Sequence, residues 1–122
     1  MEYTNLEVWI EARKLTNLIY NGTRNFPKEE LFGLTNQIRR SAISIPSNIA
    51  EGCGRRTSND TLQFLHISRG SLFELETQIF LALDQKYISE NDFQEISNQI
   101  LTCKKLINGF INYYKNLNNG NR

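Results

Sequence analysis

Residues 26–54 read FPKEELFGLTNQIRRSAISIPSNIAEGCG, and this stretch decides the fold of the chain. Its apolar side chains recur at spacings of three and four residues, which is the pattern of a helix with one buried face. The members of this stripe are Leu31, Leu34, Ile38, Ala42, Ile45 and Ile49. Pro46 lies inside the pattern, and a proline removes a helical hydrogen bond and kinks the helix. Because the periodicity continues past Pro46, we predict one kinked helix over residues 27–52.

A second stripe, of polar side chains, runs along another side of this predicted helix. It consists of Gln37, Ser41, Ser44, Asn48 and Glu51, with Arg40 beside it. A surface helix needs only its apolar face to fold, so the polar stripe is expected to contact something else. One interpretation is a binding surface on which Arg40 and Gln37 donate hydrogen bonds to a phosphate or a carboxylate. The other is a buried polar network in which the stripe meets Ser71 and Glu74 of the following helix.

Four helices are predicted in all, because no segment alternates for long with the period of a β-strand. They cover residues 5–25, 27–52, 59–85 and 90–117. The last of them carries an unbroken heptad stripe from Phe93 to Leu117, which is typical of a bundle helix. The connections are short, and 122 residues is the size of one domain. We therefore predict an all-α fold, an antiparallel up-down-up-down four-helix bundle that occupies residues 1–122 as a single domain.

The third predicted helix is apolar on more than one side. Its core stripe runs from Leu62 to Ala82, yet several large apolar side chains fall outside that stripe. The aromatic ones are Phe64, Phe73 and Phe80. A helix that is apolar around most of its circumference is buried on more than one side, which is difficult to arrange within one small bundle. We therefore predict that these phenylalanines form the interface between copies of the chain.

The composition argues against several classes of protein. The chain holds 14 basic and 13 acidic residues, so it lacks the strong positive charge of many nucleic-acid-binding domains. No apolar run approaches the length of a transmembrane helix and no signal-peptide pattern is recognisable, so we expect a cytoplasmic protein without a membrane span. Cys53 and Cys103 are then expected to be free thiols.

No catalytic group of residues is recognisable in the sequence. His66 is the only histidine, and the Glu-x-x-His pattern of bundle metal sites does not accompany it. Neither cysteine has a histidine at a fixed local spacing, and no glycine-rich phosphate loop is present. The sequence therefore predicts no cofactor, no metal and no enzymatic activity.

Two long runs carry a resemblance to a known family. They are residues 26–52, FPKEELFGLTNQIRRSAISIPSNIAEG, and residues 64–83, FLHISRGSLFELETQIFLAL. With these runs the chain resembles the four helix bundle proteins related to the product of open reading frames inside 23S rRNA intervening sequences. The resemblance implies a short antiparallel bundle that assembles into a ring-shaped homopentamer. A related group, the accessory variability determinant proteins of diversity-generating retroelements, shares this assembly and binds a reverse transcriptase and nucleic acid.

Four arginines are the expected contacts if nucleic acid binds. They are Arg39, Arg40, Arg55 and Arg56. A ring of copies repeats this weakly basic patch, and avidity then strengthens binding. We therefore expect a non-enzymatic homopentameric binding module that contacts RNA, DNA or a nucleic-acid enzyme through these arginines. Two alternatives stay open: Arg55 and Arg56 form only a solvated turn, or the chain is a structural or protein-partner scaffold with no nucleic-acid role.

Overall fold

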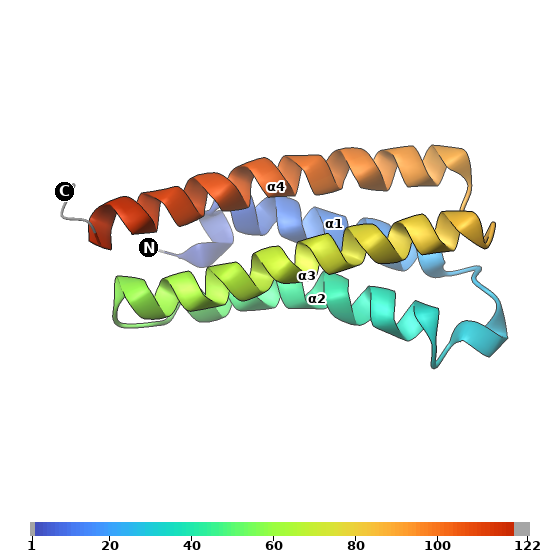
Figure 1. Ribbon diagram of the computed structural model, residues 1–122, viewed down its shortest axis with the longest axis horizontal. Helices are drawn as coiled ribbons and strands as arrows, with labels where there is room; N and C mark the ends of the chain where they lie inside the picture. Colours follow the sequence, from blue (N-terminus) through green and yellow to red (C-terminus); the bar gives the residue numbers. More distant parts are fainter. Residues whose placement is uncertain (1, 119–122) are drawn as a thin grey trace.

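The computed structural model describes residues 2–118, and four long helices make up most of them. The helices are α1 (Glu7–Thr23), α2 (Leu34–Cys53), α3 (Ser58–Asp84) and α4 (Glu90–Asn118), with short 3-10 helices η1 (Tyr3–Asn5) and η2 (Lys28–Glu30). Each long helix packs against the one before it and the one after it in the chain, and α4 also packs against α1 (Figure 1). The prediction of an all-α, antiparallel four-helix bundle is therefore confirmed.

The core lies along the axis of the bundle and is built from the apolar stripe of each helix. Its fully buried side chains include Leu15 and Ile19 of α1, Ile38, Ile45 and Ile49 of α2, Leu65, Leu72, Leu75 and Ile79 of α3, and Ile96, Ile100 and Ile107 of α4. The stripe of α4 departs from the heptad prediction near its end. Ile111 is buried there, whereas Phe110 and Tyr114 are only partly buried. An α-helix drifts from a strict heptad by about 20° in each repeat, which moves the buried position by one residue.

The prediction that the second helix begins at residue 27 is wrong, because α2 begins at Leu34. The carboxylate of Glu30 reaches forward and accepts a hydrogen bond of 3.0 Å from the backbone N–H of Leu34. Gly33 permits this approach, since a Cβ atom there would lie 2.7 Å from Glu30 Oε1. The residues before α2 consequently leave the helical path. Leu31 is 51% exposed and Phe32 is 91% exposed, although Leu31 belonged to the predicted apolar stripe.

Pro46 lies within α2, which continues through it as one helix, as predicted. Because proline has no N–H, the carbonyl of Ala42 loses its helical partner. The hydroxyl of Thr16 on α1 lies 3.1 Å from that carbonyl and 3.0 Å from the carbonyl of Ala12. A hydroxyl carries a single hydrogen, so the two carbonyls share it. The adjacent helix thus supplies the hydrogen bond that Pro46 removes.

The ends of α3 and α4 are closed by local hydrogen bonds. Thr57 accepts a hydrogen bond from the backbone N–H of Asp60, and Ser89 accepts one from that of Asp92, each of 3.1 Å, as expected of helix N-caps. At the other end of α3, Lys86 adopts a left-handed conformation with φ 63°. The N–H of Lys86 bonds the carbonyl of Leu83, and the next N–H bonds that of Ala82, which is the Schellman pattern.

Candidate functional site

A polar groove follows the boundary between α2 and α3, and we call it the α2–α3 groove. It has a volume of about 490 Å³ and is lined by Asn36, Gln37, Arg40, Ser41 and Ser44 from α2, by Ser71, Glu74 and Gln78 from α3, and by Phe32. Ser41 and Ser44 of the predicted polar stripe therefore face α3, whereas Gln37 and Arg40 are exposed at the edge of the groove and Glu51 does not line it. Small residues at these positions allow the two helices to approach closely and still bond across their boundary.

Direct hydrogen bonds join the floor of the α2–α3 groove. The hydroxyls of Ser44 and Ser71 lie 2.8 Å apart, and the amide of Asn48 donates to the Ser44 hydroxyl at 2.8 Å. Glu74 accepts a hydrogen bond of 3.1 Å from Ser41. Arg40 and Asn48, which also lie on or beside the predicted stripe, are not bonded to Glu74 among residues 2–118. Ser41 is the better placed partner because it lies on the turn of α2 that directly faces Glu74.

The side chains at the rim of the α2–α3 groove make no hydrogen bonds within the described part of the chain. Arg40 and Gln37 are exposed there and make no side-chain hydrogen bond within residues 2–118. Gln78 is only 7% exposed, and its Oε1 atom has no hydrogen-bond partner. The stripe thus divides into a bonded floor and a rim whose donors remain free. Ser41, Ser44 and Asn48 are therefore bonded, as the network interpretation predicts, whereas the binding of a ligand by Arg40 and Gln37 stays a prediction.

The four predicted contact arginines do not form one patch on a single chain. Arg40 lines the α2–α3 groove, whereas its neighbour Arg39 turns toward α1. Arg55 and Arg56 lie beyond the far end of α2, at least about 20 Å away at 1.5 Å per residue. Arg55 also forms a 2.9 Å ion pair with Glu51, so Glu51 contributes to this turn and not to the network with Ser71.

Arg39 is held in a fixed direction at the boundary between α1 and α2. Its Nε donates a 2.9 Å hydrogen bond to the hydroxyl of Thr23, which in turn donates to the carbonyl of Ile19 at 2.8 Å. Its guanidinium lies over the ring of Tyr20, 4.7 Å from the centroid. The terminal nitrogens of Arg39 have no hydrogen-bond partner among the described residues. They therefore remain available as donors whose direction is already set.

The phenylalanines predicted for the interface occupy two different environments. Phe73 and Phe80 are 49% and 52% exposed on the side of α3 that adjoins α4, where Phe73 lies under the ammonium of Lys104 and Phe80 packs on Phe93. Phe64 is only partly exposed. Phe64 lies close against Gly52, because a Cβ atom added to Gly52 would lie 3.2 Å from the Cβ of Phe64. Packing within the chain therefore already covers part of the Phe64 side chain.

Comparison with known proteins places this fold in a family. Residues 4–109 match the family model described as 23S rRNA-intervening sequence protein. The chain belongs to that family. It is also similar to a crystal structure, at 1.70 Å resolution, of a protein with unknown function from the S23 ribosomal protein family of Bacteroides thetaiotaomicron VPI-5482. The TM-score is 0.80 at 25% sequence identity, over 91% of this chain and 99% of that one. No curated protein matches the chain.

In this member of the 23S rRNA-intervening sequence protein family, the thiols are poorly suited to nucleophilic chemistry. Burial raises the pKa of the Cys103 thiol to about 12, and burial also raises the pKa of Cys53. The thiolate is the reactive form, so Cys103 is protonated at neutral pH. Over residues 2–118, no group of three or more potential ligands is placed to hold a metal ion, and no helix is long and apolar enough to cross a membrane.

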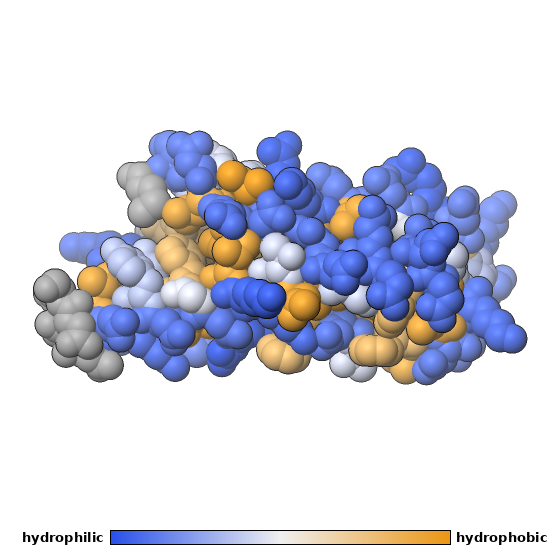
Figure 2. All heavy atoms as spheres, turned by 90° about the horizontal axis from the view of Figure 1, so that it is seen from above, coloured by the Kyte–Doolittle hydropathy of each residue, from blue (hydrophilic) through white to orange (hydrophobic). Residues whose placement is uncertain are grey.

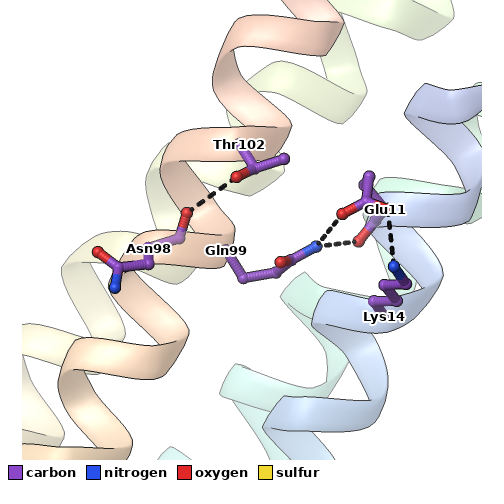
Figure 3. A network of polar contacts seen from close by, with 5 residues as sticks. All are labelled: Glu11, Lys14, Asn98, Gln99 and Thr102. Carbon is purple, nitrogen blue, oxygen red and sulfur yellow. Dashed lines mark hydrogen bonds and ion pairs between the residues drawn. The ribbon is translucent and has the colours of Figure 1, made fainter.

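A further polar contact between helices, which the sequence did not predict, joins α1 and α4. The amide of Gln99 on α4 donates to the backbone carbonyl and the carboxylate of Glu11 on α1, at 2.9 Å and 3.1 Å (Figure 3). Lys14 pairs with the same carboxylate at 3.1 Å. The hydrogen bond from Gln99 and the interaction with Lys14 lower the pKa of Glu11. The only signal in the sequence was the three-residue spacing of Glu11 and Lys14, which does not identify the partner on α4.

Proposed function

We propose that copies of this chain assemble into a ring, a homopentamer as the resemblance implies, and that the ring is a non-catalytic binding module. Its arginines contact RNA, DNA or an enzyme that acts on them. The description of the family refers to 23S rRNA, which favours a structured RNA as the first ligand to test. The module can use the free rim of the α2–α3 groove, where Arg40 and Gln37 keep unused donors.

The exposed apolar side of α3 is the observation that carries the assembly. Ile67, Phe73, Phe80 and Leu81 are 51%, 49%, 52% and 48% exposed. They lie on a single helix whose core stripe is already buried within the bundle. Large apolar side chains that stay half exposed in this way favour an interaction site on a folded protein. Contact between copies removes this surface from water, at roughly 25 cal/mol for each Å² of apolar area buried.

The assembly is tested by placing a charge on this side of α3. We expect Phe80→Glu to dissociate the ring, because it buries an unpaired carboxylate at the interface, and Phe73→Glu to weaken the ring less, because Lys104 lies beside that position. Ile10→Glu is the matched control, since Ile10 is 38% exposed on α1 and receives the same charge. Light scattering coupled to size exclusion gives the mass of each variant. A monomeric mass for the unmodified chain would remove the proposal.

Binding of nucleic acid is tested separately by fluorescence anisotropy with a labelled, structured fragment of 23S rRNA. We expect the affinity to fall steeply with salt, because counterions are released from each phosphate that is neutralised. An Arg40→Gln substitution should weaken binding and reduce the slope of log K against log salt by about one for each phosphate that the arginine neutralises. Absence of binding at low salt would exclude the nucleic-acid role.

A protein partner is the second candidate, and an apolar groove between α1 and α4 favours it. The groove has a volume of about 330 Å³ and is lined mainly by Leu6, Val8, Leu106, Phe110 and Tyr113. Figure 2 shows hydrophobic side chains gathered in the left half of this face, and further hydrophobic side chains toward its right end. An amphipathic helix of a partner fits such a groove. Recovery of one protein, resistant to nuclease and lost in a Leu106→Glu variant, would favour this function.

A further inference from the structure

A small cavity lies at the end of the bundle where α1 leads into η2 and α2 begins (Figure 1), and we call it the corner cavity. Three cations line it, one from each neighbouring segment: Arg24, Lys28 and Arg39. Thr23 and Thr35 line it as well, and Phe26 and Leu31 supply apolar walls. Its volume of about 160 Å³ is below the roughly 300–1,000 Å³ of pockets for drug-sized ligands, so it suits a single small group.

The charge of the corner cavity sets it apart from the other surface cavities. Three of those each combine one cation with one carboxylate, namely Arg40 with Glu74, Arg55 with Glu51, and Lys105 with Glu7. The corner cavity has three cations and no carboxylate among its lining residues. Like charges that share a partly apolar cavity repel one another, and an anion placed between them removes this repulsion.

The corner cavity has one donor whose direction is already set and others that are free. Arg39 uses Nε on Thr23 and stacks on Tyr20, which leaves the two terminal nitrogens of its guanidinium without a partner among residues 2–118. Thr35 is only 4% exposed, and its hydroxyl has no hydrogen-bond partner, although buried hydroxyls are normally bonded. Lys28 makes no ion pair within the described part of the chain. Arg39, whose direction is fixed, can therefore bind an anion without a large ordering penalty.

We propose that the corner cavity binds one phosphate group, held by Arg39, Arg24 and Lys28. A terminal phosphate carries nearly two negative charges and three acceptor oxygens, and a phosphodiester of RNA carries one charge and two non-bridging oxygens, so both offer acceptors to several cations at once. The phosphate comes either from a free phosphate compound or from the backbone of RNA. In the second case the inference rests on the proposed function, and it adds to that function a contact site away from the α2–α3 groove.

The test is a titration of the full chain with inorganic phosphate, followed by two-dimensional NMR at constant ionic strength. We expect the amide signals of residues 23–39 to shift, and Lys28→Gln and Arg24→Gln each to weaken phosphate binding roughly ten-fold, which corresponds to about 1.4 kcal/mol. Lys28 has no partner to lose, and Arg24 gives up only an exposed 3.2 Å hydrogen bond with Asn21, so both variants should fold normally.

Arg13→Gln is the matched control, because it removes the same charge from an exposed residue of α1 that lines neither the corner cavity nor the α2–α3 groove. It should leave phosphate binding within two-fold of the unmodified chain. Equal losses in Arg13→Gln and Lys28→Gln would overturn the inference, because they would show a response to net charge alone. Equal shifts with acetate would overturn the assignment to phosphate.

Adding the RNA fragment to the phosphate-loaded protein separates the two sources. Displacement of phosphate, seen as RNA-specific shifts at residues 23–39, supports a backbone phosphate, whereas RNA binding without displacement supports a free phosphate compound. Phosphate binding without any RNA binding would leave the corner cavity intact and reject the nucleic-acid role. RNA binding without any response to phosphate at residues 23–39 would reject the corner cavity and leave the nucleic-acid role intact.

Discussion

The pairing of Thr16 with the carbonyl left free by Pro46 predicts a measurable coupling between two helices. Ala42 is fully buried, and its carbonyl has no helical N–H to accept from. Thr16→Val keeps the shape of the side chain but removes the donor. A buried carbonyl left without a partner costs about 1–3 kcal/mol, so we expect the free energy of unfolding to fall by that amount.

A double-mutant cycle with Pro46→Ala tests the same idea, because the second substitution restores the missing donor within α2. In a Pro46→Ala background, the N–H of residue 46 bonds the carbonyl of Ala42, and Thr16 is no longer needed there. Thr16→Val should then cost at least about 1 kcal/mol less than it does in the unmodified chain. Thr16→Ser, which keeps the hydroxyl, is the matched control and should have a smaller effect than Thr16→Val in both backgrounds.

The assay is thermal or urea unfolding followed by circular dichroism at one fixed protein concentration, since assembly makes stability depend on concentration. With an unfolding entropy of about 2.1 cal/mol/K for each of the 122 residues, a loss of 1–3 kcal/mol lowers Tm by roughly 4–12 °C. An equal cost of Thr16→Val with and without Pro46 would refute the idea that Thr16 replaces the lost hydrogen bond.

Three further predictions follow from local geometry. Lys86→Gly should raise the free energy of unfolding by up to about 1 kcal/mol in urea melts, because Lys86 is left-handed, whereas Gln85→Gly, at a right-handed position, should lower it. The pKa of Glu11 is lowered from its ordinary 4.5, so its contribution to stability is present above that pH and is lost as the pH falls below it. In melts at decreasing pH, Glu11→Gln should therefore lose stability less steeply than the unmodified chain, and identical slopes would contradict this. Cys103, whose thiol pKa is about 12, should resist alkylation at pH 8 until the chain unfolds, whereas the partly exposed Cys53 should react first, as mass spectrometry of the labelled peptides would show.

Much of the bundle was predictable because helical periodicity is a local property. The stripe from Val8 to Ile19 and the heptads from Phe93 to Ile107 needed no partner to be recognised, and both are buried. The start of α2 was not predictable in the same way. Leu31 and Leu34 fit one apolar stripe, but Glu30 reaches forward and accepts a hydrogen bond from the N–H of Leu34. It also accepts one from Tyr87, at the turn between α3 and α4. A contact across 57 residues leaves no periodic signal in the sequence.

The candidate sites were likewise predictable only where they depend on spacing along a single helix. The polar stripe from Gln37 to Glu51 was visible in the sequence because its members repeat with the helical period. Which of them bond to α3 and which stay free depended on the register of α2 against α3, and this register paired Ser41 with Glu74 and Ser44 with Ser71. The corner cavity could not be found from spacing, since Arg24, Lys28 and Arg39 belong to three segments that meet only when α1 and α2 pack.

The amino-acid sequence alone therefore determined the four helices, their buried faces and the polar stripe, because each follows from side chains one or two turns apart on the same helix. Only the tertiary structure decided which polar groups found partners. It joined Thr16 to the carbonyl freed by Pro46, bonded Arg39 to Thr23 of α1, and gathered three cations around one cavity. These outcomes depend on the relative rotation and register of separate helices, which the packing of the whole core sets and no local pattern encodes.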